Sequence, residues 1–274
     1  MITRFAPSPT GPLHLGHAYS ALTVWEEAAR EGGTALLRIE DFDSERAKPG
    51  YEAGIYEDLR WLGLDWSEPV LRQSEHRQTY LDALGALASR GLLYPCSCSR
   101  KEIAAKEPRR GWDGLVYPGT CRGRSMGDAA PEDALRLDLE KAFAATGPLP
   151  VFVETGPAHA GTHRVDPVEQ LEMLGDPVLR RRVTGDPAYV WCCPYDDARQ
   201  GITHVVRGED LWPLTGLFVL LQRLMGWPQP TFHHHALVLD AAGKRLAKID
   251  GSRALSAYRA EGATPADIRR LVGL

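Results

Sequence analysis

One short run near the start of the chain most strongly restricts its fold. Ile2–Ala6 is suited to a short buried strand, and apolar residues recur at helical spacing from His14 to Arg30. Between them, Pro7 and Pro9 stiffen the chain, and Gly11 permits a sharp bend. A strand that turns directly into a helix predicts the first unit of a parallel α/β sheet. Ligands of such sheets bind beyond the carboxyl ends of the strands, so the turn is the expected site.

The same alternation continues along the first third of the chain. A second buried strand is expected at residues 34–40, and helices are expected at residues 51–62 and 76–90. Frequent Gly and Pro from about residue 95 to residue 185 break the rhythm and predict an insertion that carries three of the cysteines.

The alternation resumes near Tyr189. The segments expected there are strands around Val190–Cys193 and Ile202–Val206, a helix over Asp210–Met225, a strand near Phe232–Leu239, and short helices over Ser252–Ala260 and Pro265–Leu271. The predicted fold is therefore α/β, with a Rossmann-like parallel-sheet catalytic domain in two halves and a short helical C-terminal segment. The predicted domain boundaries are 1–94 and 186–240 for the halves, 95–185 for the insertion, and 241–274 for a loop and helices.

Composition excludes several classes of protein. No apolar run approaches the ~20 residues that span a bilayer, and Met1–Arg4 lacks a signal segment. The net charge of −4 argues against coating of long nucleic acids, although basic residues at 101–124 surround Trp112 and predict either a local RNA-binding patch or a solvated loop. Five cysteines, an odd number, indicate a reducing compartment. We expect a cytoplasmic protein, monomeric and without membrane contact.

The turn carries residues suited to a nucleoside triphosphate. His14 and His17 are three residues apart, so they share one face at the helix start, and Gly16 allows a ligand to approach. Unpaired backbone N–H groups and the positive end of the helix dipole favour phosphate there. Near the other end of the chain, Gly243–Lys248 reads as a glycine-hinged cationic loop. Either run alone is a weak signal, but both together predict a triphosphate clamp.

Four segments now support a resemblance to a known family. Residues 4–17 resemble the signature RFAPSPTG-x-LHxGH of glutamyl-tRNA synthetases, whose last four residues are the class I HIGH motif. Residues 38–43 resemble that family's RIEDTD, and residues 189–211 resemble YNLAVVVDD…GVTHVIRGxDL. Arg245-Leu246-Ala247-Lys248 stands where the family has its KMSKS loop. The chain ends soon after this loop, so we expect no anticodon-binding domain, as in the truncated paralogues of the family.

The resemblance implies a function and a set of residues. The truncated paralogues activate L-glutamate with ATP and Mg²⁺ and transfer it to the queuosine base in the anticodon of tRNA(Asp). It assigns ATP binding and catalysis to His14, Gly16, His17 and Lys248, and amino-acid binding to Arg4, Ala6, Ser8, Glu40, Tyr189 and Arg207. Arginines suit carboxylates because they can bind them bidentately, and Glu40 suits an ammonium group.

The cysteines of the insertion resemble the zinc pattern Cys-x-Cys…Tyr-x-x-x-Cys of those paralogues. The resemblance implies a structural zinc ion held by Cys96, Cys98, Tyr117 and Cys121. Three thiolates are good zinc ligands, whereas chemistry alone would favour histidine over tyrosine as the fourth.

Several alternatives remain open at this stage. Arg245 and Ala247 depart from the KMSKS pattern, which favours slower activation or, at the extreme, an inactive zinc-stapled RNA-binding paralogue. A minimal synthetase that charges the 3′ end of a tRNA is a second alternative. A structural ion pair of Arg207 with Glu209 or Asp210 is the alternative to carboxylate binding. Cys192 and Cys193 are expected in the core, and His233–His235 lack an evident acidic partner for a metal site.

Overall fold

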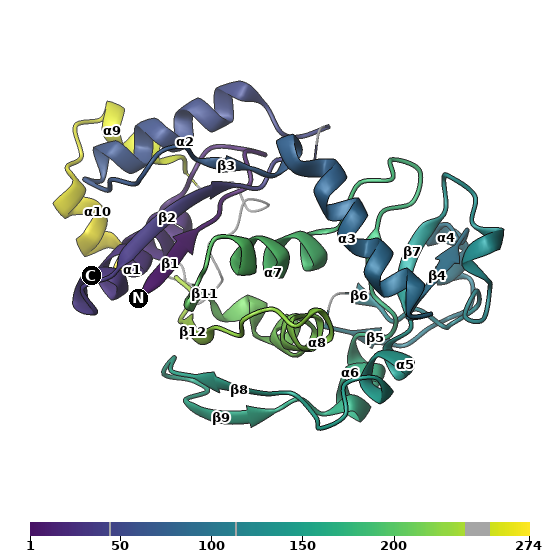
Figure 1. Ribbon diagram of the computed structural model, residues 1–274. Helices are drawn as coiled ribbons and strands as arrows, with labels where there is room; N and C mark the ends of the chain where they lie inside the picture. Colours follow the sequence, from purple (N-terminus) through teal and green to yellow (C-terminus); the bar gives the residue numbers. More distant parts are fainter. Residues whose placement is uncertain (44, 113, 239–252) are drawn as a thin grey trace.

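The computed structural model describes residues 1–43, 45–112, 114–238 and 253–274. Its centre consists of two sets of parallel strands that lie side by side (Figure 1). The first set has the order β1-β2-β3, and the second has the order β11-β12-β8 with the antiparallel strand β9 at its edge. The backbone N–H of Thr203 donates to the carbonyl of Ile2 at 2.9 Å, which joins the two sets at β1 and β11. The predicted parallel α/β fold is confirmed.

These central strands are short. Their bounds are β1 Ile2–Phe5, β2 Thr34–Ile39, β3 Leu71–Arg72, β8 Val151–Glu154, β9 Gly161–Arg164, β11 His204–Gly208 and β12 Thr231–His235. The helices around them are α1 Leu15–Arg30, α2 Pro49–Trp61, α3 Arg77–Ser89, α7 Tyr189–Arg199, α8 Thr215–Met225, α9 Leu255–Ala260 and α10 Pro265–Val272. The 3-10 turns η1 Gln73–His76 and η3 Glu209–Leu214 precede α3 and α8.

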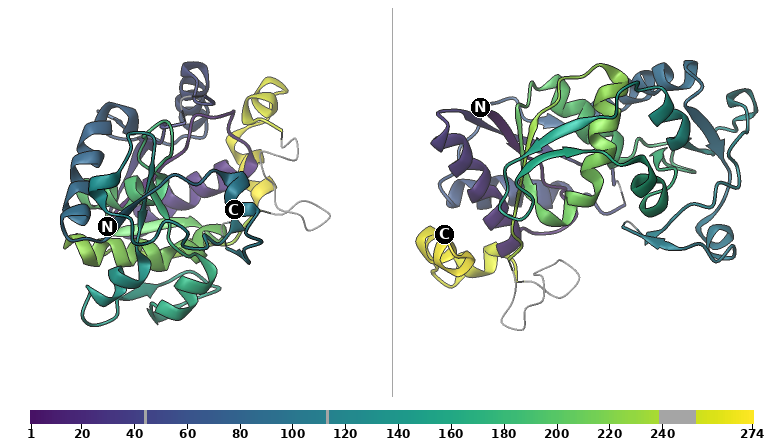
Figure 2. Two further views of the ribbon diagram at one scale, coloured as in Figure 1. Left: turned by 90° about the vertical axis from the view of Figure 1, so that its right-hand side faces the viewer. Right: turned by 90° about the horizontal axis from the view of Figure 1, so that it is seen from below.

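The insertion forms its own antiparallel sheet, of order β10-β7-β4, at the end of the molecule opposite α9 and α10 (Figures 1 and 2). Its strands are β4 Leu93–Cys96, β7 Ala134–Leu137 and β10 Val178–Arg180, with the small hairpin β5 Arg110–Gly111 and β6 Gly114–Leu115. Its helical segments are α4 Arg100–Ala104, η2 Met126–Asp128, α5 Leu139–Ala144 and α6 Pro167–Met173. None of the helices in the described ranges combines the length and the apolar character of a membrane span.

Apolar packing joins the two parts of the molecule. One buried cluster packs Leu22 of α1 and Leu59 of α2 against Ile39 of β2. A second extends from Trp191 of α7 and Leu217 of α8 to Leu137 in the insertion sheet. Because the second cluster crosses from one part to the other, the insertion has a fixed place beside the parallel strands.

One predicted element is wrong. The alternation of helices and strands predicts a strand around residues 190–193. The structure places them in α7, with Trp191, Cys192 and Cys193 all buried. A helix satisfies its own backbone hydrogen bonds, which allows α7 to be buried on several sides without a partner strand. The prediction that both cysteines are buried in the interior is confirmed, but on a helix.

Candidate active site

After β1, His14 and His17 cap the N-terminus of α1. His14 is the N-cap of α1, and its Nδ1 accepts a hydrogen bond from the backbone N–H of Gly16 at 3.1 Å. Nδ1 of His17 in turn accepts from the backbone N–H of His14 at 3.2 Å. The ring centroids lie 3.8 Å apart. This reciprocal cap fixes both imidazoles at the positive end of the α1 dipole.

A cavity of about 580 Å³ opens at this turn. Its lining includes His14, Gly16 and His17, and all six predicted amino-acid-binding residues: Arg4, Ala6, Ser8, Glu40, Tyr189 and Arg207. Lys248, like the rest of the predicted Gly243–Lys248 loop, lies outside the described residues. The described residues that flank this segment lie near the cavity, since Val238 lines it and Ala254 forms a β-bridge with His14.

Arg4 is held by a buried carboxylate at one wall of the cavity. Its Nε and Nη2 donate to the two oxygens of Asp197, at 2.8 and 3.2 Å. Nη1 of Arg38 donates to the same carboxylate at 2.8 Å. Burial alone would lower the pKa of Arg4, but the charge of Asp197 raises it above its usual range. Arg4 therefore lines the cavity with its charge already compensated.

Arg207 differs in its electrostatics. Its Nη2 donates to Oγ1 of Thr215 at 2.8 Å and to the carbonyl of Leu211 at 3.2 Å, and its Nε donates to Nε2 of His234 at 2.9 Å. Nη1 is buried without a hydrogen-bond partner, and within the described ranges no carboxylate forms an ion pair with this guanidinium. Burial accordingly lowers the pKa of Arg207. The alternative of an ion pair with Glu209 or Asp210 is not what the structure shows.

Glu40 supplies a negative charge to the same cavity. Its side chain is 11% exposed and lies 3.3 Å from Nη2 of Arg38. Burial raises the pKa of this carboxyl to about 7, although the charges of Arg38 and Arg4 oppose the rise. A buried acid that titrates near neutrality can respond strongly to a cation brought beside it.

A larger cavity of about 890 Å³ lies between the insertion and the elements α7 and η3. Arg46, Tyr189 and Leu211 line both cavities, so the two adjoin at these residues. Its other charged lining is mainly basic and comprises Arg100, Arg136, Arg181 and Arg182, with Asp43 and Asp176 as the acids.

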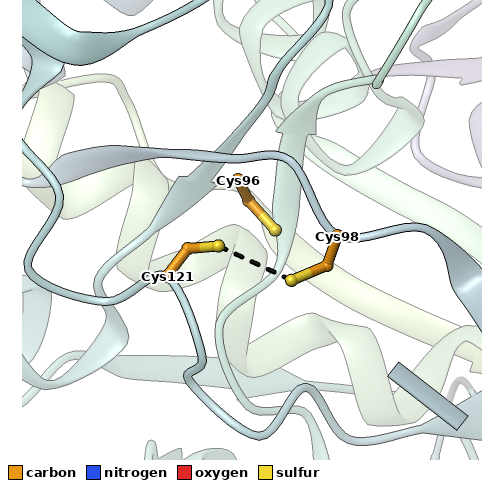
Figure 3. Close-up of side chains that lie close together, drawn as sticks. All are labelled: Cys96, Cys98 and Cys121. Atoms are coloured by element: carbon orange, nitrogen blue, oxygen red, sulfur yellow. Dashed lines mark hydrogen bonds between the residues drawn. The ribbon is translucent and has the colours of Figure 1, made fainter. Parts of the chain in front are cut away.

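Three thiols converge in the insertion (Figure 3). The sulfur atoms of Cys96, Cys98 and Cys121 all lie within 4.8 Å of one another, and those of Cys98 and Cys121 are 3.5 Å apart. The hydroxyl of Tyr117 lies 3.3 Å from the sulfur of Cys96 and 3.6 Å from that of Cys98. The structure thus brings together the four residues that the sequence pattern singled out.

Sequence reasoning missed the residues that hold the cavity-lining arginines in place. Arg38 and Asp197 received no role, and the sequence showed no acid near His233–His235, whereas Oε2 of Glu154 lies 2.6 Å from Nδ1 of His234. A signal was present in each case. Arg38 interrupts an apolar strand, and Glu154 shares the inward face of its strand with Phe152. A charged residue at an inward strand position requires a partner.

Comparison with known proteins identifies the class. The family model of the catalytic domain of class I tRNA synthetases (E and Q) matches residues 1–127 and 160–274. The chain therefore belongs to the class I tRNA synthetases, which confirms the resemblance found in the sequence.

Individual relatives show which members of this class the chain resembles. The chain is similar to the glutamyl-Q tRNA(Asp) synthetase of Rhodobacter capsulatus, with 56% identity over the whole of both chains. It is 39% identical to the enzyme of the same name from Nitratidesulfovibrio vulgaris, over 97% of this chain and 83% of that one.

Solved structures agree with this assignment. A glutamate tRNA ligase from Elizabethkingia meningosepticum, in complex with its amino acid, is 30% identical with a TM-score of 0.76. The match covers 99% of this chain and 60% of that ligase, so this chain spans less than two thirds of the ligase. The methionyl-tRNA synthetase of Mycobacterium tuberculosis, with 10% identity and a TM-score of 0.61, shares the fold.

Proposed function

We propose that this chain activates L-glutamate with ATP and transfers the glutamyl group to the queuosine base in the anticodon of tRNA(Asp). The names of its relatives support the amino acid and the acceptor. The observation that carries the proposal is Arg207, a buried guanidinium at the cavity wall with an unpartnered Nη1 and no ion-paired carboxylate in the described part of the chain. Such a group strongly favours an anionic ligand.

Glutamate carries two carboxylates and one ammonium group, and the cavity lining includes charged residues of both signs that suit them. Arg207 is proposed to bind the side-chain carboxylate, for which its uncompensated charge gives the stronger attraction. Glu40 is proposed to bind the ammonium group. Arg4, Ala6, Ser8 and Tyr189 line the remaining wall and would set the orientation of the substrate.

ATP is proposed to bind at the start of α1. The backbone N–H groups of the helix, the imidazoles of His14 and His17, and the small Gly16 suit its phosphates. Mg²⁺ would accompany the nucleotide. A carboxylate oxygen of glutamate attacks the α-phosphorus, the bond to pyrophosphate breaks, and glutamyl-adenylate forms. Lys248 is predicted to stabilise the leaving pyrophosphate.

The larger, basic cavity is the proposed entrance for the anticodon. It adjoins the smaller cavity at Arg46, Tyr189 and Leu211, so a nucleoside held there could reach the adenylate. A queuosine hydroxyl then attacks the carbonyl carbon, and AMP leaves. The phosphates of an RNA strand would contact Arg181 and Arg182. Because tRNA and ATP meet in the cytoplasm, the proposed reaction belongs there.

The four insertion residues fit a zinc ion. Tetrahedral Zn–S bonds of ~2.3 Å place sulfur atoms about 3.8 Å apart, close to the 3.5 Å between Cys98 and Cys121. The hydroxyl oxygen of Tyr117 accepts from the backbone N–H of Cys121 at 2.8 Å, and the guanidinium of Arg136 lies 3.7 Å from the centre of its ring. Both contacts hold the ring and the oxygen of Tyr117 beside the three thiols. Four protein ligands close the coordination sphere, so the ion would fold the insertion and take no part in the reaction.

Labelled glutamate tests the proposed function. With ATP, alkali-labile label should appear on tRNA(Asp) that contains queuosine and be absent from queuosine-free tRNA(Asp), with the mass increase located by mass spectrometry of the anticodon nucleosides. Equal labelling of tRNA(Glu) would instead identify a minimal synthetase of the 3′ end. Well-folded protein without glutamate-dependent ATP–pyrophosphate exchange would identify an inactive RNA-binding paralogue.

Glu40 should make glutamate binding pH-dependent. Its carboxyl has a pKa raised to about 7 by burial, so below pH 7 the free protein holds it mainly neutral and must lose that proton to bind an ammonium group. The KM for glutamate should therefore rise as pH falls from 8 to 6, by up to about tenfold per pH unit below the pKa. Steady-state ATP–pyrophosphate exchange measures this, and a flat profile between pH 8 and 6 would contradict it. In Glu40→Gln, KM should be high and independent of pH over this range.

A further inference from the structure

A buried chain of polar groups runs from Glu154, at the end of β8, to Arg207 on β11. Nε of Arg207 donates to Nε2 of His234 at 2.9 Å, and Nδ1 of the same ring lies 2.6 Å from Oε2 of Glu154. The side chains of His234 and Glu154 are fully buried. Neither residue lines the cavity, whereas Arg207 does. The imidazole of His234 and the carboxylate of Glu154 therefore lie on the side of the Arg207 guanidinium away from the cavity.

The hydrogen bonds determine where the proton lies. Oε1 of Glu154 accepts from the backbone N–H groups of Gly156 and His234, at 2.6 and 2.8 Å. Burial alone would raise the pKa of Glu154, but the hydrogen bonds from His234 and Gly156 lower it to about 2. Glu154 is therefore an ionised acceptor, and Nδ1 of His234 must donate. Burial lowers the pKa of His234 to about 4, so the neutral ring presents the Nε2 lone pair to Arg207.

We propose that Glu154 and His234 are positioning residues that fix the guanidinium of Arg207 at the wall of the amino-acid cavity and thereby set the selectivity for a carboxylate. This inference rests on the proposed function. The fixed tautomer of His234 holds Nε, while Thr215 and Leu211 hold Nη2, so Nη1 is the nitrogen of this guanidinium that is left without a hydrogen-bond partner. The neutral ring also separates the two charges, and Arg207 keeps the attraction for an anion that a direct ion pair would cancel.

The chain of contacts depends on a segment outside the family match. Glu154 and Gly156 lie in residues 128–159, between the two matched ranges. Strand β8 pairs with β12 in parallel, with Glu154 opposite Phe232. A Cβ atom on Gly156 would lie 2.2 Å from the backbone carbonyl oxygen of His234, so only glycine permits this approach. The segment 128–159 thus contributes to the site through β8.

A pair of asparagine variants tests the proposal. In His234→Asn the shorter amide can still contact Glu154, but it provides no hydrogen-bond acceptor for Nε of Arg207. The KM for glutamate should rise about tenfold, the preference for glutamate over glutamine in ATP–pyrophosphate exchange should fall by a similar factor, and the KM for ATP should change less than about twofold. His233→Asn is the matched control. His233 lies on the same strand as His234 and does not line the cavity. Its Nδ1 lies 3.0 Å from Oγ1 of Thr155.

Two more variants separate positioning from structure. His234→Gln extends an amide toward the place of Nε2 and should restore much of the glutamate KM. Glu154→Gln removes the fixed acceptor for Nδ1 and should resemble His234→Asn. If a variant at either position melts near the parent temperature but keeps the parental KM and selectivity, the positioning role is overturned. Absence of glutamate-dependent exchange in the unmodified protein would instead overturn the proposed function.

Discussion

Replacement of Arg207 by glutamine should lower kcat/KM for glutamate about a thousandfold. Removal of one partner from a buried, hydrogen-bonded charge pair costs about 3–5 kcal/mol, and each 1.4 kcal/mol corresponds to tenfold. In the free protein, however, this charge is buried without an ion-paired carboxylate in the described ranges, so it opposes folding. The melting temperature should therefore change by only a few degrees. ATP–pyrophosphate exchange and thermal unfolding measure the two effects.

Two further substitutions control this experiment. Arg199→Gln makes the same change at an exposed position of α7 and should leave both kcat/KM and stability unchanged. Arg207→Lys keeps the charge but loses the guanidinium nitrogens that contact His234 and Thr215. Its kcat/KM should therefore lie between that of Arg207→Gln and that of Arg199→Gln. The assignment of Arg207 would fail if Arg207→Gln kept its activity within about tenfold, or if the KM for ATP rose as much as that for glutamate.

The part of the fold that local patterns determine could be predicted. The βα units from residue 2 to residue 90 have clear periodicity and marked ends, and the structure contains each predicted strand and helix there. Segment 190–193 failed because its residue types favour a strand, whereas its burial among helices decides in favour of α7. Whether such a segment forms a strand or a helix is decided by tertiary packing, which the local sequence pattern does not show.

The candidate site shows the same division. The predicted ligand-binding residues stand near strand ends and at the starts of α1 and α7, and the family resemblance singled them out in the sequence. Their supports are long-range pairs, such as Arg4 with Asp197, 193 residues apart, and Glu154 with His234, 80 residues apart. The sequence shows that a buried charge needs a partner but leaves the partner's identity to the fold.

Loss of the proposed zinc ion should give the second large effect. Metal binding at a structural site is folding free energy, and apparent values for zinc-finger peptides reach about 10–16 kcal/mol. Even ~4 kcal/mol would lower the melting temperature of a protein of this size by roughly 10 °C. Cys121→Ala should therefore lose the zinc ion, which elemental analysis measures. Its melting temperature should fall by roughly 10 °C. A strong chelator should produce the same shift in the unmodified protein.

The location of the cluster predicts which activity suffers. Cys98 and Tyr117 line the larger cavity and are absent from the smaller one, so zinc loss should impair transfer to tRNA more than glutamate activation. Cys192→Ala is the control, because it removes a buried thiol outside the cluster and should retain zinc. Tyr117→Phe should fold with zinc that chelators remove more readily, since three thiolates remain. A zinc-free native protein, with equal melting of Cys121→Ala and Cys192→Ala, would contradict the metal site.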